Sequence, residues 1–277
     1  MTPSSLPLFF TVVLANVVFG RPSQTPSLST PGANVVAKDI FILAGQSNMA
    51  GRGGVHGGKW DGNIPPGCKP HPSILRFSAK HKWEVAKEPL HADIDVKKIC
   101  GIGPGMPFAN EVLANVSKTR VVGLVPCAIG GTRMTKWARG TPLYARLVHR
   151  ANESLREGGA IRGLLWFHGE SDTESRIDAE AYKDRMETFI NDLRSDLNVP
   201  NLPVIQVVTP SGDKKFMDTV RRAQKEVNLP DVWWVDARGL NMKSDDHMHL
   251  TTISQVHLGR NMARVFLASY GPSSPHT

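Results

Sequence analysis

The sequence predicts an α/β protein whose mostly parallel sheet is covered by helices on both faces. Five apolar runs rich in β-branched and aromatic residues have strand length: Asp39–Ala44, Arg120–Pro126, Arg162–Phe167, Pro203–Thr209 and Asp231–Asp236. Five amphipathic segments have helix length: Met106–Val116, Pro142–Glu157, Ala179–Leu197, Phe216–Val227 and Thr252–Ala268. Because helices separate the strands, we expect βαβ crossovers and a parallel, five-stranded sheet.

The composition is that of one folded domain. The chain has 277 residues, 40% of them hydrophobic and 21% charged, which is ordinary for a soluble globular protein with one sizeable core. The formal net charge is +8, but Lys and Arg are dispersed, and no zinc-finger, RNA-recognition or helix-turn-helix pattern accompanies them. We therefore expect a solvated basic surface and no nucleic-acid partner. Retention on an acidic polysaccharide matrix is the alternative interpretation of the charge.

The two ends of the chain differ from the rest. Residues 1–20 contain a nearly continuous apolar run, Leu6–Val18, that is too short to span a bilayer, followed by the small residue Gly20. We expect a cleaved signal peptide and a secreted, extracellular or cell-wall protein without membrane attachment. An uncleaved N-terminal anchor is the alternative, because no Lys or Arg precedes the run. Residues 21–37 and 271–277 are rich in Pro, Ser and Thr and are expected to be disordered, which leaves 38–270 as the folded domain.

The first strand, Asp39–Ala44, leads directly into Gly45-Gln46-Ser47-Asn48-Met49. The glycine marks a sharp turn, so Ser47 lies at the carboxyl end of a strand, where open α/β sheets bind their ligands. The unpaired N–H groups that begin the following helix face a developing oxyanion in such a turn. Ser47 is therefore a candidate nucleophile, with Gln46 and Asn48 beside it supporting the site or contacting the substrate.

Residues 52–104 interrupt the alternation and are rich in glycine and proline, with one short apolar run, Ile74–Phe77. We interpret them as a long surface excursion beside the site. The excursion contains Cys68 and Cys100, whereas Cys127 follows the second strand and has the setting of a core thiol. We expect a Cys68–Cys100 disulfide, since three cysteines in a secreted chain allow at most one.

Two sequons are candidates for N-glycosylation of a secreted protein. They begin at Asn115 and Asn152. Asn115 is the better candidate because it lies at the end of a predicted helix, before a predicted strand, where we expect an exposed turn.

The second and third strands also end in polar or glycine-rich blocks. Ala128-Ile129-Gly130-Gly131-Thr132 follows the second strand, and its glycines allow a ligand to approach the backbone closely. The third strand runs into Trp166-Phe167-His168-Gly169-Glu170-Ser171-Asp172. We interpret Glu170 as a buried acceptor that fixes the site loops. A metal-binding or glycosidase carboxylate pair of Glu170 and Asp172 is the alternative interpretation. No other residues have metal-ligand spacing, and no cofactor is expected.

Three tryptophans in loop sequence are candidate platforms for stacking on sugars. These are Trp60, Trp83 and Trp137.

The last block, Asp246-His247-Met248-His249, precedes the final helix. An Asp and a His three positions apart supply a base and its orienting carboxylate for a serine nucleophile. Thr252-Ile253-Ser254-Gln255 fits a capping box, which would fix the start of the helix and with it the loop that carries Asp246 and His249.

Together these blocks resemble the SGNH hydrolase superfamily and, within it, the sialate O-acetylesterase-like carbohydrate esterases, which include family 6 acetylxylan esterases and plant relatives. The resemblance extends from about Asp39 to Phe266, with the four blocks in the family's order. The α/β-hydrolases share the order Ser, Asp, His, but they carry G-x-S-x-G and take the Asp and His from separate loops. The resemblance implies a three-layer α/β/α sandwich with a flavodoxin-like sheet.

The resemblance also implies roles for individual residues. Ser47 is the nucleophile, His249 the base and Asp246 the carboxylate that orients it. The family's spacing favours Asp246 over Asp245, and the context His249-Leu250-Thr251-Thr252 favours His249 over His247.

The implied oxyanion donors are the N–H groups of Ser47 and Gly131. Relatives carry Gln-Gly-Glu-Ser-Asp where this chain has His168-Gly169-Glu170-Ser171-Asp172. We therefore expect the imidazole of His168 to replace the glutamine amide as a third donor, since a neutral imidazole still carries one N–H.

The activity implied is that of a secreted, monomeric serine esterase that removes O-acetyl groups from a carbohydrate through an acyl-enzyme. Two alternatives stay open: a polysaccharide O-acetyltransferase using the same site, and a catalytically silent polysaccharide-binding protein. The acetylated glycan is not specified by the sequence, and xylan, pectin and sialic acid are all candidates.

Overall fold

The computed structural model describes residues 38–116, 120–210, 212 and 214–270, besides Met1. The predicted signal peptide, linker and tail lie outside the described residues. Within the described part, no helix is long and apolar enough to cross a membrane.

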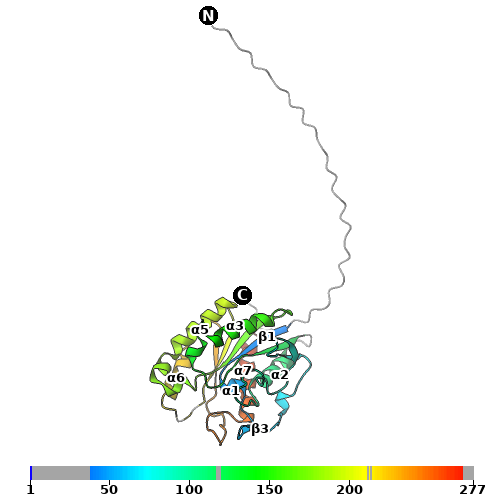
Figure 1. The fold of residues 1–277 in the computed structure, drawn as a ribbon, viewed down its shortest axis with the longest axis vertical. Coiled ribbons are helices and arrows are strands. Elements are labelled where there is room, and N and C mark those ends of the chain that lie inside the picture. The colour runs from blue at the N-terminus through cyan, green and yellow to red at the C-terminus, as the bar shows by residue number, and fades with distance from the viewer. Residues whose placement is uncertain (2–37, 117–119, 211, 213, 271–277) are drawn as a thin grey trace. The chain divides into compact units, whose positions relative to one another are not determined.

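The predicted parallel sheet is present, and all five expected strands belong to it (Figure 1). They are β1 (Lys38–Gly45), β6 (Val121–Pro126), β7 (Ala160–Phe167), β8 (Val204–Val208) and β9 (Val232–Asp236). Their order is β6-β1-β7-β8-β9, and each neighbouring pair is parallel. This order is the flavodoxin-like one, with the direction of winding changing beside β1.

The number of strands was predicted wrongly, because the sheet has seven and not five. The additional strands β4 (Ile74–Phe77) and β5 (Trp83–Val85) form an antiparallel hairpin, and β4 pairs in parallel with β6. The short apolar run inside the excursion is therefore an extension of the main sheet. A separate small hairpin joins β2 (Val55–His56) to β3 (Lys59–Trp60).

The expected helices are present with small shifts of their ends. They are α2 (Gly105–Asn115), α3 (Pro142–Ser154), α6 (Met217–Lys225) and α7 (Thr252–Tyr270). The segment expected as one helix over Ala179–Leu197 is divided into α4 (Arg176–Glu180) and α5 (Tyr182–Asp196). Short elements complete the fold: α1 (Ser47–Ala50) and the 3₁₀ turns Pro66–Cys68, Met134–Trp137 and Asp172–Glu174.

The central strand β1 separates two hydrophobic cores. Phe41 faces α2 and α7, where it makes edge-to-face contacts with Phe108 and Phe266, each with ring centroids 4.9 Å apart. Ile40 and Ile42 belong to the opposite core, which includes residues of α3, α5 and α6. Because successive strand residues point to opposite faces, this pattern produces the three layers visible in Figure 1.

The three cysteines are all buried and free, so the expected Cys68–Cys100 disulfide is wrong for this structure. Cys100 instead lies against the guanidinium of Arg52, with Sγ 3.4 Å from a guanidinium nitrogen. Burial raises the pKa of the Cys100 thiol to about 11.

Both sequon asparagines are exposed on helices. Asn115 is the last residue of α2, and Asn152 lies on α3.

Candidate active site

Ser47 begins α1 at the carboxyl end of β1. Gly45, with φ of +121°, allows the chain to turn there, and a Cβ at this position would collide with the carbonyl oxygen of Phe167 in β7. The Gln46 N–H donates to the same carbonyl at 2.8 Å. The side chain of Ser47 is thus held at the centre of the sheet edge, in a largely buried position with 7% exposure.

The loop between β9 and α7 brings His249 and Asp246 to Ser47. His249 Nε2 lies 2.9 Å from Ser47 Oγ, and His249 Nδ1 lies 2.8 Å from Asp246 Oδ2. The three side chains form a continuous chain of hydrogen bonds with the geometry of a nucleophile, a general base and an orienting carboxylate.

Asp246 is the carboxylate in contact with His249, and its neighbour Asp245 points elsewhere. Asp246 Oδ1 accepts the N–H groups of Met248 at 3.0 Å and His249 at 2.9 Å, which orients the carboxylate. Asp245 pairs with His56 at 3.0 Å on the exposed side of the loop. His247 is exposed, with φ of +48°.

The electrostatic setting keeps His249 neutral at neutral pH. Burial lowers the pKa of His249, the Asp246 carboxylate acts to raise it, and Arg52 and Lys243 lower it further, with a net decrease. Burial acts to raise the pKa of Asp246, but hydrogen bonds from Lys243, Met248 and His249 outweigh this, so the pKa lies well below its usual range. The imidazole of His249 therefore faces the Ser47 hydroxyl with an unprotonated Nε2.

The glycine turn after β6 lies directly beside Ser47. A Cβ on Gly130 would be 3.3 Å from the Ser47 Cβ and 2.8 Å from the Arg52 guanidinium, so a larger residue would require Arg52 to shift. The Gly130 N–H donates to Asp95 Oδ2 at 3.1 Å and is not free for a substrate. The next residue, Gly131, is exposed with φ of +70°, and within the described chain its N–H has no protein acceptor.

Asn48 ties the Ser47 turn to the loop that carries the base. Its Nδ2 donates to Glu170 Oε1 at 2.7 Å and to the Met248 carbonyl at 3.2 Å, while its Oδ1 accepts the Leu250 N–H at 3.0 Å. Gln255 of α7 donates to the Asn48 carbonyl at 3.1 Å. Since Asn48 is fully buried, these bonds fix the distance between the serine and histidine elements.

Glu170, in the loop after β7, and Gln46, between β1 and Ser47, complete this buried network. Glu170 is 5% exposed, and its second oxygen, Oε2, has no hydrogen-bond partner in the described structure. Burial raises its pKa, although the Asn48 amide opposes this. Gln46 is 2% exposed and lies with its Oε1 3.4 Å from the Ser171 N–H.

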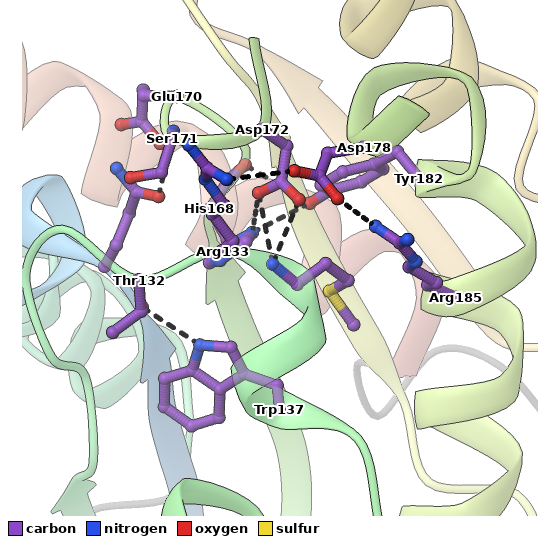
Figure 2. A network of polar contacts seen from close by, with 12 residues as sticks. Thr132, Arg133, Trp137, His168, Glu170, Ser171, Asp172, Asp178, Tyr182 and Arg185 are labelled. Atoms are coloured by element: carbon purple, nitrogen blue, oxygen red, sulfur yellow. Dashed lines mark hydrogen bonds and ion pairs between the residues drawn. The ribbon is translucent and has the colours of Figure 1, made fainter. Parts of the chain in front are cut away.

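The expectation that His168 donates to the oxyanion is wrong for this structure. The imidazole is 0% exposed and stacks on Trp166 and Tyr182, with ring centroids 5.0 and 5.9 Å away. Its Nδ1 lies 3.3 Å from the Tyr182 hydroxyl and 3.8 Å from Asp172 Oδ2 (Figure 2). Burial lowers the pKa of His168 to about 3. The imidazole is thus enclosed in the core and not exposed toward a substrate, and its Nε2 has no hydrogen-bond partner in the described structure.

The predicted sugar platform at Trp137 is also wrong. Trp137 is 0% exposed, packs edge-to-face on Trp166 at 5.3 Å, and donates from its indole nitrogen to Thr132 Oγ1 at 3.1 Å (Figure 2). Trp83 lies in the edge strand β5, where its ring packs at a tilt against Phe77 with ring centroids 5.0 Å apart. Trp60 is partly buried in β3, against the core on the α2 side.

The capping prediction is displaced by one residue. The hydroxyl of Thr251, not Thr252, accepts the Ser254 N–H at 3.2 Å and so caps α7. Gln255 does not reach back to the cap but turns inward to Asn48. The loop before α7 is still fixed at the start of the helix, by the contact between Thr251 and Ser254 and by the bond from Gln255 to Asn48.

Three residues around the site were missed in the sequence. Arg52 and Asp95 form a buried ion pair under the Gly130 turn, and the Lys243 ammonium lies 2.9 Å from Asp246 Oδ2. The position of Arg52, five residues after Ser47, was the one available signal. Asp95 and Lys243 carry no local pattern that distinguishes them from surface charges.

A cavity of about 270 Å³ adjoins the loop of Asp246. Its lining includes three methionines, Met217, Met242 and Met248, and polar groups from Glu170, Lys214, Asp246 and His247. Among the described residues, no group of three or more His, Cys, Asp or Glu side chains is arranged to hold a metal ion.

Comparison with known proteins identifies the family. Residues 37–268 match the model of the family described as carbohydrate esterase, sialic acid-specific acetylesterase. A curated relative from Arabidopsis thaliana, "Probable carbohydrate esterase At4g34215", is 49% identical over 252 residues, which are 88% of this chain and 95% of the relative.

Two solved structures share the fold. The crystal structure of the Arabidopsis thaliana protein AT4G34215 has a TM-score of 0.81 at 50% identity, covering 84% of this chain and 98% of that one. NanS has a TM-score of 0.71 at 16% identity, covering 85% and 98%. The matched region includes every element that builds the site, and this chain belongs to the sialic acid-specific acetylesterase family of carbohydrate esterases.

Proposed function

We propose that this carbohydrate esterase removes O-acetyl groups from a glycan through an acyl-enzyme formed on Ser47. The observation that supports this most directly is the continuous contact from Ser47 Oγ through His249 to Asp246, at 2.9 and 2.8 Å. The family supplies the substrate class, an esterified carbohydrate.

The reaction follows from the geometry. Ser47 Oγ attacks the acetyl carbonyl carbon while its proton moves to His249 Nε2, and Asp246 stabilises the imidazolium. The Ser47 and Gly131 N–H groups donate to the oxyanion. The tetrahedral intermediate then collapses, and the sugar oxygen leaves with the proton from His249. Water, deprotonated by His249, attacks the acetyl-serine and releases acetate.

The environment suits this role for His249. Because burial and the two nearby cations lower its pKa, the imidazole is neutral and able to accept a proton at neutral pH. Asp246 is ionised at that pH because its own pKa is depressed.

The test is acetate release from acetylated xylan, pectin and sialic acid, measured for the wild type and for Ser47→Ala. The substitution should lower the rate by about 10⁴-fold or more, because little catalysis survives loss of the nucleophile. Ser195→Ala, at an exposed position on α5, is the matched control and should keep the wild-type rate. A fluorophosphonate should label Ser47.

Each negative outcome has a definite meaning. Near-normal acetate release by Ser47→Ala, or labelling of another serine, contradicts the proposal. Release of acetate only when a second sugar is present as acceptor assigns the site to acetyl transfer instead.

We also propose that the protein is secreted, on the basis of the apolar run Leu6–Val18 followed by Gly20. Expression of the full chain with a C-terminal tag in plant or yeast cells tests this. We expect the protein in the medium with a new N-terminus near Arg21. Retention in the cell with an intact N-terminus would contradict secretion.

A further inference from the structure

Lys243 is a buried cation placed directly behind the proposed catalytic pair. Its side chain is 6% exposed. The ammonium lies 2.9 Å from Asp246 Oδ2, the same oxygen that contacts His249 Nδ1 at 2.8 Å, and 3.3 Å from Asp245 Oδ1. One carboxylate oxygen is therefore shared between the ammonium of Lys243 and the imidazole of His249.

The backbone of Lys243 closes the same loop. Its N–H donates to the His249 carbonyl at 2.8 Å, and its carbonyl accepts the His247 N–H at 3.0 Å. One step further out, Met242 and Leu250 form an antiparallel bridge. Lys243 therefore lies at the neck of a closed loop, and its side chain crosses the inside of that loop to reach Asp246.

The charges that face His249 come from three parts of the chain. Asp246 contacts the imidazole directly, and Lys243 lies behind Asp246. Arg52, after α1, is compensated by its ion pair with Asp95. Asp245 also compensates Lys243, but its other partner is His56 and its side chain is 39% exposed, so its charge is better screened by solvent.

We propose that Lys243 is a positioning residue for the esterase reaction, which holds Asp246 toward His249 and sets through its charge the pH range in which His249 accepts a proton from Ser47. The inference rests on the proposed function of these three residues. A lysine in this place differs in effect from a neutral donor, which would orient Asp246 equally well but would leave the imidazole more basic.

The direction of the effect follows from the sign of the charge. A cation near the imidazole disfavours the imidazolium, so removal of Lys243 stabilises the protonated form of His249. The acidic limb of the pH–rate profile should then move to higher pH. Removal of one unit charge at this distance from the imidazole shifts the midpoint of the acidic limb by about half a pH unit or more, even in a dielectric like that of water.

The experiment measures the rate constant for fluorophosphonate labelling of Ser47 between about pH 4 and 9. This readout depends on the ionisation of His249 and needs no knowledge of the natural glycan. The variants are Lys243→Met, the conservative Lys243→Arg, and Lys87→Met as a control that removes one exposed positive charge elsewhere. Circular dichroism at each pH confirms that the variants are folded.

We expect Lys243→Met to move the acidic limb upward by about half a pH unit or more. Lys243→Arg and Lys87→Met should keep the wild-type limb. Asp245→Asn, at a side chain that is 39% exposed, should move the limb in the opposite direction, because the charge of Lys243 is then less compensated. This last variant keeps the test decisive if Lys243→Met does not fold.

The inference is overturned if the acidic limb of Lys243→Met stays at the wild-type pH, even if the plateau rate falls. If Lys243→Met is unfolded, an unchanged limb in Asp245→Asn has the same meaning. A fall in rate without a shift means that Lys243 only holds the loop. Failure of the wild type to label at Ser47 would instead overturn the proposed function, so the two failures are distinguishable.

Discussion

Asn48→Ala should destabilise the protein strongly, because one buried amide joins three segments of the site. The substitution removes the bonds to Glu170 at 2.7 Å, to the Met248 carbonyl at 3.2 Å and from the Leu250 N–H at 3.0 Å. Asn48 is 0% exposed, so water does not readily replace the lost amide. Ala also lacks the volume to fill the space.

The magnitude follows from the groups left without partners. The Leu250 N–H loses its acceptor, and the Glu170 carboxyl, whose Oε2 is already unpaired, loses its remaining side-chain donor. Each unsatisfied buried group costs about 1–3 kcal/mol, so the two together cost about 4 kcal/mol. For a domain of this size the expected fall in Tm is about 8–16 °C.

The assay is thermal and urea unfolding at neutral pH and over a pH series, with Glu170→Gln as the matched variant. A glutamine oxygen still accepts from Asn48, so Glu170→Gln should change stability by less than about 1 kcal/mol. Burial raises the pKa of Glu170 in the folded state, so the wild type loses stability as pH rises through that pKa and the Gln variant does not. A fall in Tm of less than about 3 °C in Asn48→Ala would refute the reasoning.

Two further predictions concern buried carboxylates. Asp95→Asn should reduce kcat of the esterase by about 10-fold or more and lower Tm, because it removes the ion pair with Arg52 and disturbs the acceptor that holds the Gly130 turn; wild-type kcat on an aryl acetate would show that the turn does not need this contact. Burial raises the pKa of Asp172 to about 7, so the wild type should lose stability as pH rises from about 4 to 7. Asp172→Asn should flatten that slope in urea titrations, and equal slopes in the two proteins would exclude a buried, protonated Asp172.

The sequence by itself determined the layers of the fold and the position of the candidate nucleophile. The continuous apolar run within Asp39–Ala44 predicted a buried strand, and the following Gly45 and Ser47 predicted a turn at its carboxyl end. Asp246 and His249 were recognisable because they lie three residues apart, within one loop. Such signals are local, since periodicity and turn chemistry are properties of short segments.

Tertiary structure decided which charged and aromatic groups surround Ser47, Asp246 and His249. The run Ile74–Phe77 belongs to the sheet because it pairs with the edge of β6, and no local sequence pattern indicates this pairing. His168 and Trp137 lie in loop-like sequence but are buried. His168 stacks on Trp166 and on Tyr182 of α5, and Trp137 packs edge-to-face on Trp166 of β7.

The charges of the site illustrate the same limit. Lys243, Arg52 and Asp95 resemble ordinary surface residues in the sequence, and only the closing of the loop and the turn places them around Asp246 and Gly130. Burial and electrostatic pairing depend on distances between segments far apart in the chain. Composition and sequence spacing do not specify those distances, so the electrostatic environment of the site was decided by the folded structure alone.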